Sequence, residues 1–222
     1  MLTHAQLSEQ LHLQNQLNCI VHPDWVNQGF SWTRAIMVES TELLDHIGWK
    51  WWKHQELDIE QAWLEMVDIW HFILSHELAS CDGDQAEAAG NLADEFKEPA
   101  TIVSTAFYAT DLQTLGMREL VHALIGMAAS GHVSVTAFVM LMDKLTLSWD
   151  ELHRQYLAKN VLNIFRQNHG YKTGEYAKVW GKFGEDNQVL AQLMEAKPDA
   201  TAEQLMEKLE SVYTTVIESA AA

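Results

Sequence analysis

Four carboxylates in the first third of the chain have types and spacing that suit chemistry. Glu39 and Glu42 form one pair, and Glu65 and Asp68 form a second, each spaced three residues apart. On a helix this spacing places both side chains on one face, with Cβ atoms about 5–6 Å apart. Residues 63–74 are apolar on nearly every side of the second pair, which predicts a buried helix. Two helices that each present two carboxylates predict a site for divalent cations.

The local shortage of positive charge supports a metal site. Between residues 32 and 78 the fixed cations are Arg34, Lys50 and Lys53, and a carboxylate buried without a counter-charge costs several kcal/mol. Oxygen ligands without cysteine select hard ions, so we expect two or more Mg²⁺ ions, with Mn²⁺ as a substitute. The alternative is two ordinary amphipathic helices whose acids face solvent. The apolar surroundings of the second pair argue against that alternative.

A basic segment stands out from an otherwise acidic chain. The formal charge of −17 disfavours binding to a nucleic-acid polymer or to an anionic membrane, yet residues 154–182 contain six lysines and arginines and one acid. On the helix expected here, Lys159, Asn163 and Arg166 share one face, and Asn160 continues it. Cations beside amides suit phosphate groups. A solvated basic helix is the alternative.

Two flanking features extend this binding surface. Tyr171 and Lys178 belong to a glycine-punctuated basic loop after Gly170 that is able to close over an anion. Gln14 and Asn18 place two amides one turn apart on the first predicted helix, where they can hydrogen-bond the edge of a base or sugar. Solvated surface amides are the alternative for this pair.

The connection between the two acidic helices is unusually rich in tryptophan. Its sequence, WKWWK at residues 49–53, includes Trp49, Lys50 and Lys53. Two interpretations fit this composition. The indoles either plug the end of the bundle, or they line a pocket for a flat ligand, with the lysines near the charged tail of that ligand.

The elements that position these residues are predicted to be helices in one all-α domain spanning residues 1–222. Only 3 Pro and 11 Gly, 48% apolar residues and repeated 3.6-residue periodicity support that fold class. Ser31 is a candidate N-cap for the Glu39 helix. Because a short connection makes the two acidic helices antiparallel neighbours, their carboxylates can converge. Helices are expected over about 3–18, 31–48, 58–79, 85–98, 148–170, from 185 and from 201, with two more in 100–147.

The cellular compartment is predicted from the absence of a signal-peptide pattern, a membrane span and a disulfide framework. The first residues show no basic and apolar signal-peptide pattern, and no run reaches the roughly 18–20 apolar residues that span a bilayer. Cys19 and Cys81 make no disulfide framework and fit a reducing compartment. We therefore expect a cytoplasmic protein that binds no membrane.

Several blocks occur in an order that resembles the dimeric, all-α dUTP pyrophosphatases (dUTPases). They are LQNQLN (13–18), ExxEL…WKWWK (39–53), ExxDIWHFILS (65–75) and KNVLNIFRQNHGYKTGEYAKVWGKFGEDN (159–187). The core motifs cover roughly 11–78 and 154–190. Residues 79–150 are similar to the family only in being helical, so mobile or interface helices are expected there.

The resemblance implies a homodimer that hydrolyses dUTP, and also dUDP, to dUMP with Mg²⁺. It implies that Glu39, Glu42, Glu65 and Asp68 ligate the ions and that Glu39 also contacts the attacking water. The residues it places at the substrate are Gln14, Asn18, Trp49, Lys50, Lys53, His71 and Asn163 toward the nucleoside or its surroundings, and Lys159, Asn160, Arg166, Tyr171 and Lys178 toward the phosphates.

Other function classes remain open on the residues alone. One is a related all-α pyrophosphatase that acts on dCTP or another nucleotide, and the other is a non-catalytic helical bundle that binds metal. A di-iron carboxylate bundle would need Glu-x-x-His pairs on two helices. Here only His71 follows a candidate ligand, Asp68, at that spacing, and the basic helix would have no role.

Overall fold

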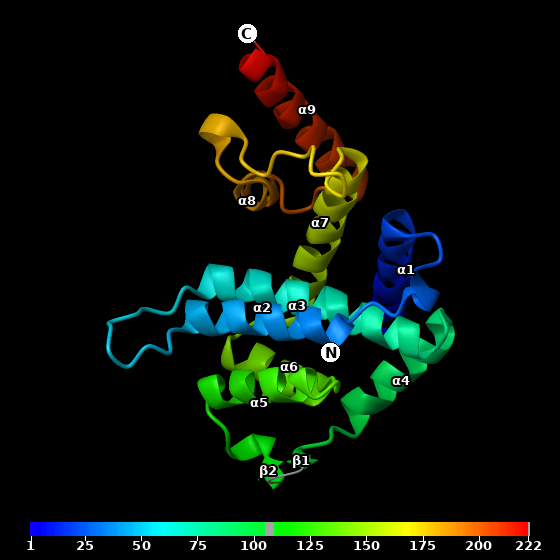
Figure 1. The fold of residues 1–222 in the computed structure, drawn as a ribbon, viewed down its shortest axis with the longest axis vertical. Coiled ribbons are helices and arrows are strands. Elements are labelled where there is room, and N and C mark those ends of the chain that lie inside the picture. The colour runs from blue at the N-terminus through cyan, green and yellow to red at the C-terminus, as the bar shows by residue number, and fades with distance from the viewer. Residues whose placement is uncertain (105–108, 222) are drawn as a thin grey trace.

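The chain folds into α-helices joined by short connections, as seen in a computed structural model that describes residues 1–104 and 109–221 (Figure 1). The predicted all-α class is confirmed. Among the described residues, no helix combines the length and apolar character needed to cross a membrane. The helices are α1 (His4–Val21), α2 (Trp32–Ile47), α3 (Ile59–Ser80), α4 (Gln85–Lys97), α5 (Met117–Ala129), α6 (Val135–Lys144), α7 (Trp149–Asn168), α8 (Asp186–Ala196) and α9 (Ala202–Ala221).

Side-chain caps begin most of these helices where the sequence predicted them. Thr3 and Gln6 form a complete capping box on α1, and Asp58 accepts a hydrogen bond from the backbone N–H of Gln61 at the start of α3. Ser31 occupies the predicted N-cap position of α2, but its hydroxyl makes no capping hydrogen bond to the helix.

The acidic helices α2 and α3 lie side by side and antiparallel at the centre of the molecule (Figure 1). Helices α5 and α6 pack beneath them, and α1 and α4 cover one end. Fully buried apolar side chains, Trp70 and Phe138 among the largest, hold these layers together. This central core fixes the faces of α2 and α3 that carry the predicted metal ligands.

Helix α7 connects that core to a second one. Its first half packs on the central bundle through Leu152 and Tyr156, and its second half packs with α8 and α9 around Phe165 and Trp180. In Figure 1, α7 rises from the bundle toward α8 and α9, with the C-terminus at the far end. The basic face of α7 thus spans the junction between the two cores.

The segment after α4 differs from the prediction of helix. Two strands, β1 (Ile102–Ser104) and β2 (Ala109–Asp111), pair antiparallel with Ile102 opposite Asp111, and a 3-10 turn, Leu112–Thr114, precedes α5. Residues 105–108, also expected to be helical, lie outside the described residues. The β-branched run at 101–103 explains the strand, because β-branched side chains fit an extended backbone better than a helix.

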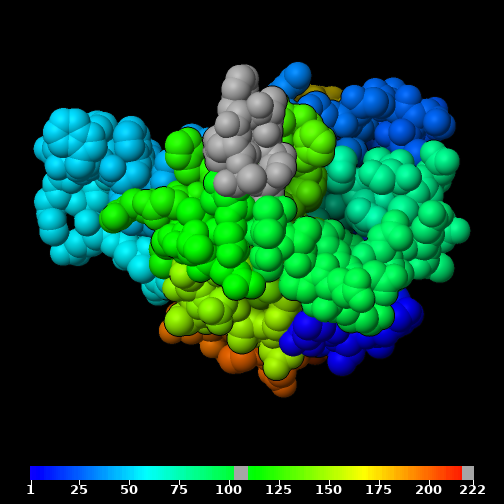
Figure 2. Space-filling view, turned by 90° about the horizontal axis from the view of Figure 1, so that it is seen from below, coloured from blue at the N-terminus to red at the C-terminus, as the bar shows by residue number. Residues whose placement is uncertain are grey.

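The tryptophan-rich connection, residues 48–58, projects from the end of the α2–α3 pair as an extended loop (Figure 1), and in Figure 2 it stands out from the body of the molecule. Trp51 is 89% exposed and Trp52 57% exposed. Within the residues that the structure describes, these indoles neither plug the end of the bundle nor line a pocket with the acidic residues.

Helices α5 and α6 supply core rather than a free apolar face. Leu120, Leu124, Phe138 and Leu141 are fully buried within the single chain. The apolar faces of α5 and α6 are therefore largely buried by the folding of one chain.

Candidate functional site

A cavity of about 450 Å³ lies where α1, α2, α3 and α7 meet the segment that follows α7. This volume falls within the usual range of small-molecule sites, about 300–1,000 Å³. Most of the residues that the sequence assigned to metal or substrate line it. They are Gln14, Asn18, Glu39, Glu42, Glu65, Asp68, His71, Lys159, Asn163, Arg166, Tyr171 and Lys178.

Three of the four predicted metal ligands converge at one point of the cavity. Carboxylate oxygens of Glu39, Glu42 and Glu65 all lie within 4.8 Å of one another. Asp68 lies beside them but outside this group, since its Oδ2 accepts a hydrogen bond from Lys159 Nζ at 2.8 Å. The antiparallel packing of α2 on α3 therefore brings the acids together as the spacing predicted.

Crowding and burial raise the pKa values of Glu39 and Glu65. Burial, then the nearby charges of Asp68 and Glu42, raise the pKa of Glu39 to about 7. Burial, then the charges of Asp68 and Glu39, raise the pKa of Glu65 to about 8. Part of the negative charge is therefore suppressed near neutral pH, because the chain supplies too little positive charge at this point.

The donor set fits a hard divalent cation. All three groups offer oxygen, and they lie close enough for one ion to contact more than one of them. A cation would remove the like-charge repulsion that raises the pKa values of Glu39 and Glu65. The chemistry of this cluster therefore supports metal binding by Glu39, Glu42 and Glu65, with Asp68 available beside them.

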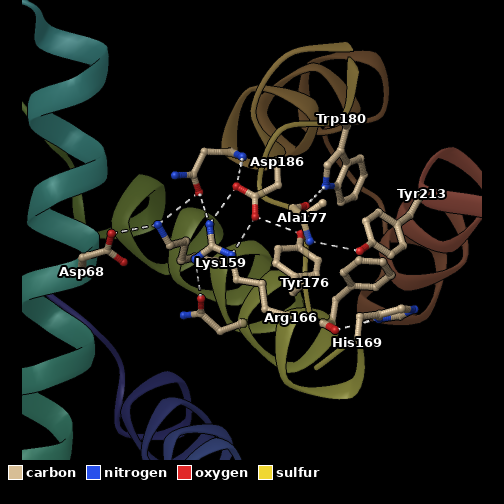
Figure 3. Close-up of polar contacts among 12 residues, drawn as sticks. Asp68, Lys159, Arg166, His169, Tyr176, Ala177, Trp180, Asp186 and Tyr213 are labelled. Atoms are coloured by element: carbon tan, nitrogen blue, oxygen red, sulfur yellow. Dashed lines mark hydrogen bonds and ion pairs between the residues drawn. The ribbon is translucent and has the colours of Figure 1, made fainter. Parts of the chain in front are cut away.

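The opposite wall is basic, and its two buried cations are already paired within the chain. Arg166 Nε and Nη2 donate to the two carboxylate oxygens of Asp186 at 2.8 and 2.9 Å, while Lys159 binds Asp68 (Figure 3). Both ion pairs are largely buried. Burial favours the neutral guanidine, but the bonds to Asp186 outweigh it and raise the pKa of Arg166. Lys159 and Arg166, two of the predicted phosphate-binding cations, thus each have an internal carboxylate partner.

The Arg166–Asp186 ion pair also anchors the loop that follows α7. Tyr176, within the loop, donates its hydroxyl to Asp186 Oδ2 at 2.9 Å, and the indole of Trp180 is fully buried against Phe165 (Figure 3). Arg166 therefore holds the loop and the start of α8 against α7. The loop residues Tyr171 and Lys178 reach the cavity from this anchored position.

A hydrogen-bonded amide cluster forms the deep end of the cavity. Gln14 Nε2 donates to Asn18 Oδ1 at 3.1 Å and to Ser75 Oγ at 2.9 Å. Gln14 Oε1 lies 2.7 Å from His71 Nδ1, and the His71 ring stacks on Tyr156 at 4.3 Å. Burial lowers the pKa of His71 to about 3, so the imidazole is neutral. The predicted one-turn spacing of Gln14 and Asn18 is confirmed as a shared buried face.

The aromatic wall of the cavity comes from residues that the sequence interpretation missed. Trp32 and Phe72 line it with ring centroids 6.3 Å apart and planes inclined at 31°, and Phe30 packs edge-on against Trp32. Phe30 and Trp32 carried a sequence signal, because these two aromatic residues lie on either side of Ser31, directly before the acidic helix.

Two polar residues at the start of α8 were also missed. Asn187 Oδ1 accepts from Lys159 Nζ at 3.2 Å and from Arg166 Nη2 at 3.3 Å, and Asp186 is the partner of Arg166. Both lie in the GEDN stretch that ends the last matching block. A signal was present, because an acid directly after a basic loop is a natural partner for its cations.

Four predicted substrate residues lie away from the cavity. Asn160 faces a separate groove, where its Nδ2 donates to the carbonyl of Leu13 at 3.4 Å. Trp49 and Lys50 bind Asp45 on the outer end of α2, and Lys53 lies on the projecting loop. Within the described part of one chain, these four residues contribute nothing to the cavity lining.

Comparison with known proteins agrees with this geometry. The sequence model of the family described as dUTPase matches residues 6–171, well over half of the chain. A search of curated proteins returned no match. The match includes the four carboxylates and the basic helix that meet in the cavity. The chain therefore belongs to the dUTPase family and is a dUTP diphosphatase.

Proposed function

We propose that this enzyme hydrolyses dUTP to dUMP and pyrophosphate, and dUDP to dUMP and phosphate, with two or more Mg²⁺ ions held at the acidic wall of the cavity. The observation that carries this proposal is the juxtaposition of Glu39, Glu42 and Glu65 with Lys159 and Arg166 in one cavity. A metal-bound polyphosphate needs acids for the ions and donors for its oxygens. Family membership supplies the reaction class.

The carboxylates divide the chemistry between them. When bound, Mg²⁺ neutralises phosphate charge and readies a water for in-line attack. Glu39 has two oxygens, so one can bind an ion while the other accepts the proton of the attacking water. Its position between Glu42, Glu65 and the basic wall suits that role.

The basic wall orients the phosphates. Lys159 and Asn163 face the cavity from α7, and Tyr171 and Lys178 face it from the anchored loop. Arg166 holds this loop through Asp186 and presents the edge of its guanidinium to the same space. We infer that these groups bind the phosphate chain and keep its terminal group aligned with the attacking water.

The nucleoside occupies the deep, aromatic end. Trp32 and Phe72 offer flat apolar surface to a base, while Asn18 and His71 offer polar atoms at its edge. Gln14 supports both of these residues through hydrogen bonds. The base thus lies at one end of the cavity and the phosphates between the two charged walls.

We further propose that the enzyme acts as a homodimer. The resemblance to the dimeric dUTPases supports this assembly, and so does the projecting loop, whose Trp51 and Trp52 are exposed. Large apolar side chains gathered on one loop are typical of protein interfaces. Sedimentation of the purified chain at micromolar concentration tests the assembly, and a monomer there refutes it.

The decisive experiment measures pyrophosphate release from dUTP, dCTP, dTTP and dATP, and phosphate release from dUDP, with and without Mg²⁺. We expect release from dUTP and dUDP that requires Mg²⁺ and stops on chelation. A preference for dCTP would replace the proposed substrate. Turnover of dUTP that persists in the absence of any divalent ion would overturn the metal mechanism.

A further inference from the structure

Ser75, on α3 one turn after His71, sits at the centre of the amide cluster. It is fully buried. Its hydroxyl donates to the backbone carbonyl of His71 at 2.9 Å, much closer than the 3.5 Å to Asn18 Oδ1. Because a hydroxyl has one proton, the remaining lone pairs of Ser75 Oγ can only accept. They accept from Gln14 Nε2 at 2.9 Å and Asn18 Nδ2 at 3.1 Å.

The orientation of the Gln14 amide follows from that arrangement. With its NH₂ group turned to Ser75 and Asn18, its carbonyl Oε1 must face His71 Nδ1, at 2.7 Å. The Tyr156 hydroxyl also lies 3.1 Å from this oxygen, but its one hydrogen is closer to the backbone carbonyl of Gln10, at 2.8 Å. Both hydrogens of the Gln14 amide and its bond to His71 are used within the protein, so Gln14 acts by positioning its neighbours.

The tautomer of His71 is set in turn. An amide oxygen accepts, so His71 Nδ1 must carry the hydrogen and Nε2 must be an unprotonated acceptor. The side chain is 3% exposed. Its Nε2 is buried without a hydrogen-bond partner in the described part of the chain, and the residue lines the cavity. A buried acceptor of this kind is complete only when a ligand donates to it.

We propose that Ser75 is a specificity-determining positioning residue: its committed hydroxyl fixes Gln14, Asn18 and His71 so that the cavity presents an acceptor at His71 Nε2 beside a donor at Asn18 Nδ2. This inference rests on the proposed function and explains how that function selects its base. Asn18 Nδ2 has a second hydrogen besides the one given to Ser75.

This polarity matches one class of base edge. Uracil presents an N3–H donor flanked by carbonyl acceptors, which complements an acceptor beside a donor. Cytosine presents an unprotonated N3 and an amino donor. Its N3 would place an acceptor against the acceptor His71 Nε2, and its amino group would place a donor against the donor Asn18 Nδ2. A site whose buried polar atoms stay unpaired rejects such a ligand strongly. Thymine shares the uracil edge, so this device does not discriminate against its methyl group.

The kinetic test uses Ser75→Ala with three nucleotides. The variant removes the fixed acceptor, so the Gln14 amide can rotate and His71 can take either tautomer. We expect the ratio of kcat/KM for dUTP over dCTP to fall about tenfold or more. The ratio of dUTP over dTTP should stay within about twofold, because both bases lose the same contact.

A matched control separates this effect from the loss of a buried hydroxyl. Ser40 on α2 is also fully buried and donates to a backbone carbonyl four residues earlier, that of Ile36. Ser40→Ala should leave both nucleotide ratios unchanged. If Ser75→Ala and Ser40→Ala lower the dUTP to dCTP ratio equally, or if neither does, the proposal is wrong.

A second measurement does not depend on turnover. In protein with ¹⁵N-labelled histidine, long-range ¹H–¹⁵N spectra distinguish the two neutral imidazole tautomers, and His71→Gln identifies the relevant signals. We expect wild-type His71 to be wholly in the Nδ1–H form, and Ser75→Ala to show a mixture. An Nε2–H form in the wild type overturns the inference. Absence of dUTP hydrolysis overturns the proposed function instead, and the tautomer spectra still decide whether Ser75 sets the hydrogen bonding of His71.

Discussion

The two charged walls of the cavity differ in how completely the chain neutralises them. On the acidic wall, Glu39, Glu42 and Glu65 crowd together, and burial with mutual repulsion raises the pKa values of Glu39 and Glu65. On the basic wall, Lys159 and Arg166 each lie within 2.8 Å of a carboxylate. The acidic wall is therefore crowded with carboxylates, beside which His46 Nε2 lies 3.4 Å from Glu65 Oε1, whereas the two buried cations of the basic wall are already balanced.

This difference indicates how a polyphosphate is received. Because Asp68 and Asp186 already compensate the two cations, the basic wall offers hydrogen bonds in a fixed geometry more than it offers free positive charge. The positive charge that a triphosphate requires must then arrive with the metal ions at the acidic wall. Nucleotide and metal are expected to bind as a unit, with the acids as the site of chemistry.

The largest effect is expected at the acidic wall. Glu39→Gln keeps the size of the side chain but removes the group that ligates metal and accepts the proton of water. We expect kcat for dUTP to fall about 10²–10⁴-fold, the usual contribution of a general base. Steady-state kinetics at saturating Mg²⁺ measure it, with far-ultraviolet circular dichroism to confirm that the variant is folded.

Glu60→Gln provides the control for this change, since Glu60 is an exposed acid in the first turn of α3. It should keep the wild-type rate. If Glu39→Gln also turns over dUTP at the wild-type rate, the proton-accepting role belongs to another group.

The next effect concerns the balanced wall. Arg166→Ala leaves Asp186 buried without its partner, and breaking a buried ion pair in this way costs about 3–5 kcal/mol. Urea unfolding measures this loss, and kcat/KM should fall for dUTP, dCTP and dTTP alike because the loop loses its anchor. A ratio of dUTP to dCTP that changes as much as in Gln14→Ala would contradict this separation of roles.

A double variant distinguishes anchoring from direct binding. Arg166→Ala combined with Asp186→Asn removes the orphaned charge, so it should recover much of the stability that Arg166→Ala alone loses. Activity should stay low, because the anchored geometry and the guanidinium are still missing. Full recovery of activity would mean that the unpaired charge of Asp186 caused the loss in Arg166→Ala, and that turnover needs neither the anchor nor the guanidinium.

The acidic site could be read from the sequence because its signal is local. A three-residue spacing on two neighbouring helices determines which side chains share a face, and the apolar surroundings of Glu65 and Asp68 determine which face is buried. The structure confirms that Glu39, Glu42 and Glu65 converge. The same local rules predicted most helix boundaries, since caps and periodicity depend on residues within one or two turns.

Long-range partners could not be read in this way. The pairing of Arg166 with Asp186 and of Lys159 with Asp68 depends on how α7 crosses α3 and on the path of the loop, which no spacing encodes. The location of the tryptophans at 49–53 could not be predicted for the same reason. Their composition indicates a flat apolar surface but not which part of the molecule that surface faces. Trp32 supplies the aromatic wall instead.

A third, smaller effect tests whether the acidic wall is under-neutralised. The pKa of Glu65 is raised from 4.5 to about 8 in the folded protein, so its contribution to stability is full below about pH 4.5 and is lost as pH rises through about 8. In the absence of metal, the stability of Glu65→Gln relative to wild type should therefore rise as pH increases from about 4.5 to about 8, and should level off at higher pH. A gain of at least about 1.4 kcal/mol, or about 3–6 °C in Tm, corresponds to one pKa unit.

Melting curves of both proteins with EDTA and with Mg²⁺, at about pH 5 and about pH 9, measure this difference. With Mg²⁺ the order should reverse, because wild type gains ligand-binding energy that Glu65→Gln lacks. Glu60→Gln should show neither trend. A loss of stability in Glu65→Gln that is the same in every condition would show that the carboxylate is structural.

The smallest effect compares two lysines that the sequence placed at the substrate. Lys178 is an exposed residue lining the cavity, whereas Lys50 pairs with Asp45 at the base of the projecting loop, at 2.9 Å. Exposed ionic contacts contribute about 0.2–1 kcal/mol, so Lys178→Ala should raise KM for dUTP by at most about fivefold without changing stability. Lys50→Ala should leave KM unchanged if one chain completes the phosphate end of its cavity. Measuring both values at two salt concentrations checks the electrostatic origin, because screening weakens a contact between exposed charges. A rise in KM for Lys50→Ala as large as that for Lys178→Ala would mean that the tryptophan loop reaches the substrate. The basic wall would then include residues beyond those that line this cavity.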